Sequence, residues 1–72
     1  MNQDWCEIWI DDSPEFPYIL LLCPSKEKEN QYLIIDPKED YKVIRNDSSY
    51  DEATLWLLED EYTLVNGRMD LS

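Results

Sequence analysis

The chain contains four short segments rich in apolar residues, separated by polar and proline-containing stretches. The first, Trp5 to Ile10, has the β-branched and aromatic residues that are typical of a strand. The predicted strands cover residues 4–10, 18–23, 32–36 and 41–45. Because the connections between them are short, consecutive strands are expected to pair antiparallel as a meander.

The second segment differs from the others because it has no charged or strongly polar position. Tyr18 to Cys23 is an uninterrupted apolar run between Pro17 and Pro24. A strand that is apolar at every position is typical of one that is covered on both faces. We therefore expect this strand to be central in the sheet.

A helix is expected after the fourth strand, from about residue 50 to 60. Ser49 and Glu52 form a capping box, a common start of a helix. Apolar residues then recur at helical spacing on a stripe that should face the sheet: Tyr50, Ala53, Trp56 and Leu57. In the tail, residues 62–72, the pair Asn66-Gly67 is a tight-turn signal.

These elements predict an α+β fold. The expected architecture is a four-stranded antiparallel meander with one C-terminal helix packed on one face, followed by a short strand or turn. A chain of 72 residues is too short for two cores, so residues 1–72 are expected to form a single small domain.

The charge is strongly negative and unevenly distributed. With 17 Asp and Glu against 6 Lys and Arg, the formal net charge is -11. Residues 1–25 carry five acids and no base, residues 26–45 five of each, and residues 46–72 seven acids and one base. This charge opposes direct binding to nucleic acids and to anionic membranes. It favours a protein partner with a basic surface.

The residue types that the sequence lacks exclude several kinds of catalytic and ligand-binding site. There is no histidine and one glycine, which removes the commonest general base and any glycine-rich phosphate loop. Cys6 and Cys23 are interpreted as reduced structural thiols. The acidic stretches 11–12 and 59–61 lack the spacing of a metal site and are interpreted as solvated surface. We expect no catalytic residue, no metal and no cofactor.

The cellular compartment is predicted from the absence of a signal-peptide pattern and of a long apolar run in the sequence. Residues 1–4 have neither the basic start nor the apolar stretch of a signal peptide. The longest apolar run has six residues, far fewer than a membrane span needs. A cytoplasmic protein is the expectation.

The first strand offers two alternative orientations. If Cys6, Ile8 and Ile10 face the core, then Trp5, Glu7 and Trp9 share the opposite face and form an aromatic patch ringed by acids. In the alternative, both indoles lie under the helix and the other set is exposed. The first orientation is our prediction, and it makes these three residues the leading candidates for partner binding: Trp5, Glu7 and Trp9.

A second candidate surface lies on the helix side that faces away from the predicted apolar stripe. Leu55 and Tyr62 fall there, close to three consecutive acids, Glu59, Asp60 and Glu61. The helix dipole disfavours acids at this end, so their placement suggests a function in steering a basic partner. The alternative is that the tail folds over Leu55 and Tyr62.

Two parts of the chain carry a family resemblance. The stretch from Trp56 to Met69 and the opening from Asp4 to Trp9 resemble small uncharacterised acidic proteins of cyanobacteria. The resemblance covers about a third of the chain. It implies an intracellular accessory protein, and no catalytic residue carries over from it.

The sequence therefore predicts a non-catalytic protein-interaction or accessory module that binds a larger basic protein through an acid-ringed aromatic surface. The alternative is a nucleic-acid mimic that inhibits a DNA- or RNA-binding enzyme by occupying its basic groove. A homodimer through the tryptophan face also suits so small a core.

Overall fold

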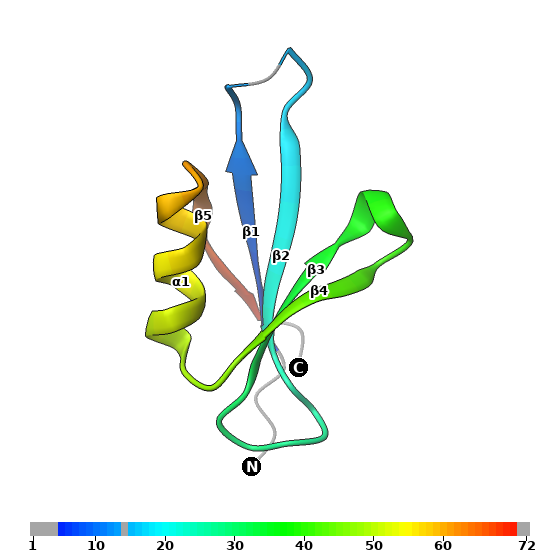
Figure 1. Ribbon diagram of the computed structural model, residues 1–72, viewed down its shortest axis with the longest axis vertical. Helices are drawn as coiled ribbons and strands as arrows, with labels where there is room; N and C mark the ends of the chain where they lie inside the picture. The colour runs from blue at the N-terminus through cyan, green and yellow to red at the C-terminus, as the bar shows by residue number, and fades with distance from the viewer. Residues whose placement is uncertain (1–4, 14, 71–72) are drawn as a thin grey trace.

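The computed structural model describes residues 5–13 and 15–70 of the chain. It has an antiparallel β-sheet and one α-helix, so the α+β class predicted from the sequence is confirmed (Figure 1). The elements are β1 Trp5–Asp11, β2 Tyr18–Pro24, β3 Tyr32–Asp36, the 3-10 helix η1 Pro37–Glu39, β4 Lys42–Asp47, α1 Tyr50–Glu59 and β5 Thr63–Asp70. Within this described part, no helix has the length and apolar character needed to cross a bilayer.

The sheet has five strands, one more than predicted. Their order is β4-β3-β2-β1-β5, so the fully apolar strand β2 is central and the tail returns to pair with β1. The tight turn expected at Asn66-Gly67 is wrong, because both residues lie inside β5. Gly67 has φ 77° next to the register shift between Glu7 and Trp9, where a bulge favours glycine.

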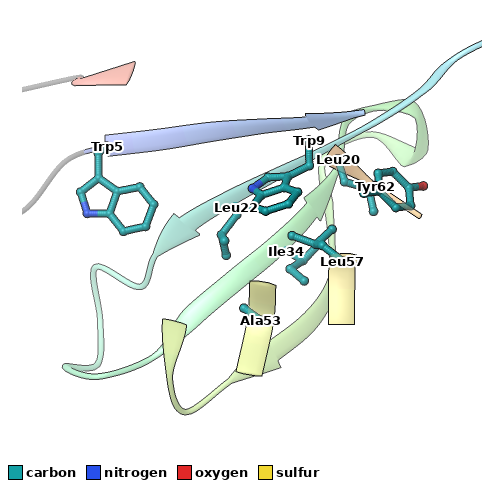
Figure 2. Packing of buried hydrophobic residues seen from close by; sticks show 8 residues of the cluster. All are labelled: Trp5, Trp9, Leu20, Leu22, Ile34, Ala53, Leu57 and Tyr62. Carbon is teal, nitrogen blue, oxygen red and sulfur yellow. The ribbon is translucent and has the colours of Figure 1, made fainter. Parts of the chain in front are cut away.

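The core lies between the sheet and α1. Ala53 and Leu57 from the helix are completely buried, and they meet large side chains from the first three strands (Figure 2). The buried cluster is Trp5, Trp9, Leu20, Leu22, Ile34, Ala53, Leu57 and Tyr62. Tyr50 and Trp56 pack against it from partly buried positions, so the helix stripe predicted from its spacing does face the sheet.

Local signals set both ends of α1. The side chain of Ser49 accepts a hydrogen bond from the backbone N–H of Glu52 at 3.1 Å, which is the predicted cap. At the other end, Glu61 has φ 66° and reverses the chain. The N–H groups of Glu61 and Tyr62 then donate to the carbonyls of Leu58 and Leu57, the pattern of a Schellman motif.

Candidate functional site

The tryptophan face of β1 is buried, so the predicted aromatic patch is wrong. Trp5 is 7% exposed and Trp9 is 4% exposed, and both indoles lie under α1 (Figure 2). The Trp5 ring lies against the rings of Tyr32 and Tyr50, at centroid distances of 6.3 and 6.0 Å. Because an indole buries more apolar area than an aliphatic side chain, this orientation gives the small core its largest gain. The alternative orientation of the first strand is therefore the correct one for the indoles.

Glu7 is also inside and cannot belong to an acidic ring. Its side chain is 2% exposed and accepts hydrogen bonds from Trp9 Nε1 at 3.1 Å and from the Tyr50 hydroxyl at 2.7 Å. These bonds satisfy a carboxylate that would otherwise be costly to bury. Glu7 thus ties β1 to the first turn of α1, which is a structural role.

The other buried acids on the helix side of the sheet are bonded in the same way. Asp36 accepts from the Tyr18 hydroxyl and from the backbone N–H of Lys38. Asp47 pairs with Arg45 at 2.8 Å. Interior acids in this protein are therefore built into the fold rather than offered to a ligand.

Tyr62 is the fourth predicted contact residue that the structure places in the core, at 6% exposed. The chain reversal at Glu61 turns Tyr62 back against the sheet, and β5 begins directly after it. Burial raises the pKa of the Tyr62 hydroxyl, with a smaller contribution from Asp60. The prediction that Tyr62 is a surface contact is wrong.

The remaining four candidates are exposed and lie together on α1. Leu55 is 57% exposed, and Glu59, Asp60 and Glu61 follow it at the end of the helix. Leu58 is 56% exposed and falls on the same side by helical spacing. We call this the acidic helix surface, and its members are Asp51, Leu55, Leu58, Glu59, Asp60 and Glu61.

The face of the sheet that points away from α1 is a second surface, which we call the open face. Its strand pairs are uncharged, as in Ile8 with Leu21, Ile10 with Ile19 and Ile35 with Val43. Most of these side chains are half-buried, while Ile19 and Val43 are 43% and 46% exposed. The open face comprises Cys6, Ile8, Ile10, Ile19, Leu21, Cys23, Leu33, Ile35 and Val43, and the edge strands add two uncharged polar residues, Asn46 opposite Leu33 and Thr63 opposite Ile10.

The two cysteines on the open face are free thiols. Burial raises the pKa of Cys6, with a further contribution from Glu7, and burial is also the main cause of the raised pKa of Cys23. Both are therefore held in the protonated, poorly nucleophilic form. Across the described residues, no group of three or more His, Cys, Asp or Glu side chains is placed to hold a metal ion.

Sequence reasoning kept the exposure of Cys6, Ile8 and Ile10 as an alternative but did not extend it to a continuous apolar face, although one signal pointed to such a face. The uninterrupted apolar run of β2 predicts a cover on both faces, and α1 covers one. The sequence of β1 does not show which face α1 covers, because both of its alternating residue sets are apolar enough to form a core.

Comparison with known proteins adds no identification: no family model, no curated protein and no solved structure matches the chain. The resemblance to small acidic proteins of cyanobacteria stays a prediction.

Proposed function

We propose that the protein is a non-catalytic interaction module that binds a larger basic protein through the acidic helix surface. The observation that carries the proposal is the position of two exposed leucines among carboxylates. Leu55 and Leu58 are each more than half exposed and share one side of α1 with Asp51 and Glu59. Apolar side chains within a charged rim are the usual composition of an interaction site.

The end of the helix supports this proposal because it departs from what stability alone favours. Glu59, Asp60 and Glu61 stand where the helix dipole favours cations. Glu61 also has a left-handed backbone conformation, which is unfavourable for a side chain other than glycine. Among the residues that the structure describes, no salt bridge neutralises these three carboxylates. Departures of this kind are expected where function competes with stability.

The two components have different roles in binding. The carboxylates, together with the net charge of -11, attract a basic surface over a distance and increase the rate of association. The leucines bury apolar area in the complex, and this contribution changes little with salt. A partner of the expected kind has an apolar pocket surrounded by Lys and Arg.

Affinity capture with matched variants tests the proposal. The full chain is used as bait in extract from its native host, at low and at moderate salt, and bound proteins are identified by mass spectrometry. We expect a protein that the wild type retains at moderate salt and that the double variant Leu55→Ser, Leu58→Ser loses. Phe16→Ser is the control, because Phe16 is 76% exposed on the β1–β2 connection, away from the helix.

The outcomes distinguish three cases. Retention that depends on the leucines supports the proposed function. A bound protein that leaves the wild type between low and moderate salt, whatever stands at positions 55 and 58, supports a nucleic-acid mimic instead. If every bound protein is the same for wild type and double variant and resists salt, the acidic helix surface is not the binding site. The cytoplasm remains the predicted compartment.

A further inference from the structure

The open face has no cover within the described chain, although its composition requires one. β2 is central and apolar on both faces, and a strand of this kind is normally covered on each side. The single α-helix among the described residues packs on the opposite face, where the buried cluster lies (Figure 2). Whatever covers the open face therefore comes from outside this part of the chain.

The distribution of charge across the sheet strengthens this point. In β1 to β4, every charged residue stands in register with the helix side, as Glu7 opposite Leu22 and Arg45 opposite Ile34 do. The full set in these four strands is Glu7, Asp11, Asp36, Lys42, Arg45 and Asp47. In an ordinary two-layer fold, the solvent side of the sheet carries the charges. Here the open face of β1 to β4 carries none.

We propose that the open face is covered by the same face of a second copy, so that the protein is a symmetric homodimer. Two sheets then pack face to face with both helices outside, and both acidic helix surfaces stay free. Because the dimer uses a different surface, this inference does not depend on the proposed function.

Electrostatics favours a second copy over other occupants. Two chains of charge -11 repel each other, and they approach best through a surface that has no acid. The open face meets that condition, and the exposed acids of α1 would lie on the far side of each sheet. A basic partner would leave its cations without counter-charges on this face, and an anionic membrane would be repelled by the chain as a whole.

The size and shape of the face suit a dimer. Five strands about 4.8 Å apart and roughly 20 Å long give a plane on the order of 500 Å². Side-chain relief increases this area toward the ~800 Å² per partner of a standard interface. Branched aliphatic side chains such as Ile8, Ile19, Ile35 and Val43 are those that interdigitate between the sheets of a sandwich. In a dimer with two-fold symmetry, the open face of one copy contacts the open face of the other.

Sedimentation velocity over a range of concentrations tests this proposal. The wild type should sediment as a particle of twice 8.7 kDa and dissociate on dilution. Leu21→Glu, which places a carboxylate at the centre of the open face, should give a monomer. The matched control is Leu55→Glu, the same substitution on the acidic helix surface, and it should remain a dimer.

Two further measurements keep the test decisive if Leu21→Glu fails to fold. Leu21→Thr retains a strand-forming side chain and should raise the dimer Kd about 100-fold. Alkylation of Cys23, a thiol of the open face, should become slower as the wild-type concentration rises, and should not do so in a monomeric variant.

A wild type that stays at 8.7 kDa at every concentration overturns the dimer. So does a dimer that Leu55→Glu breaks and that both substitutions at Leu21 leave intact. If the monomeric chain still captures a partner through Leu55 and Leu58, the dimer fails while the proposed function stands. If the protein is a dimer but captures no partner through Leu55 and Leu58, the proposed function fails while the dimer stands.

Discussion

The two faces of the sheet differ in a way that reverses the usual arrangement. The side under α1 contains both tryptophans of β1 and the buried carboxylates Glu7, Asp36 and Asp47. The open face has mainly aliphatic side chains and thiols, with the polar residues Asn46 and Thr63 on its edge strands, and no charge at its register positions in β1 to β4. A covered face therefore carries the charges, and an uncovered face is apolar.

A charged residue in a strand therefore does not identify the solvent side of the sheet. Glu7 is buried because Trp9 and Tyr50 donate hydrogen bonds to it, and these bonds replace the water that it loses. The side chains of the open face differ from Glu7 because they need no hydrogen-bond partner. Burial under any apolar surface stabilises them.

The largest effect is expected from shortening a tryptophan on the covered side. Trp9→Ala should lower the free energy of unfolding by about 4 kcal/mol, because it leaves a cavity among Leu20, Leu22 and Leu57 and removes a donor to Glu7. Urea denaturation, followed by circular dichroism at low protein concentration, measures the loss.

The matched substitution on the open face is Ile19→Ala. Ile19 is 43% exposed, so the same measurement at low concentration should give a loss of about 1 kcal/mol or less. Equal losses for the two variants would contradict the assignment of the faces.

A moderate effect of opposite sign is expected at the end of α1. Glu61→Gly should raise the free energy of unfolding by about 1 kcal/mol, since glycine adopts φ 66° without strain. The same variant should bind the captured partner less well, because it removes one of the steering carboxylates. Glu61→Ala is the control, since it removes the charge and keeps the backbone strain. If Glu61→Gly is no more stable than Glu61→Ala, the conformation of residue 61 does not limit stability.

The smallest expected effect is a loss of folding stability at alkaline pH. The Tyr18 hydroxyl donates to the Asp36 carboxylate, and this bond, aided by burial, raises the pKa of Tyr18 to about 12. Since an unfolded tyrosine ionises near 10, the neutral form favours the folded chain. Its contribution is complete below pH ~10 and is lost as pH rises through 12.

The comparison of wild type with Tyr18→Phe isolates this contribution. The difference in unfolding free energy between them should be constant up to pH ~10 and should shrink toward pH ~12. A difference that does not change over this window would mean that the bond to Asp36 does not stabilise the fold.

Local signals predicted the elements well. The cap at Ser49, the helical spacing of Ala53 and Leu57 and the continuous apolar run of β2 are properties of neighbouring residues, and the structure has each element where they indicate it. The tail was harder, because pairing of β5 with β1 is a long-range contact. The turn signal at Asn66-Gly67 was read locally, whereas the glycine serves a bulge.

The orientation of β1 could not be predicted because both of its alternating sets can form a core. Trp5 and Trp9 compete with Ile8 and Ile10, and Glu7 appeared to mark the solvent side. Its acceptance of bonds from Trp9 and Tyr50 depends on where α1 docks, which no local pattern contains. For this reason Trp5, Glu7, Trp9 and Tyr62 were misplaced, while the acids of the helix end were correctly expected at the surface.

The most direct test of the account is a nuclear Overhauser measurement on the folded chain. We predict strong contacts from the Trp9 indole to the methyl groups of Leu57, and none from Ile8 or Leu21 to the helix (Figure 2). Contacts from Ile8 and Leu21 to Leu57, together with a solvent-exposed Trp9 indole, would contradict it.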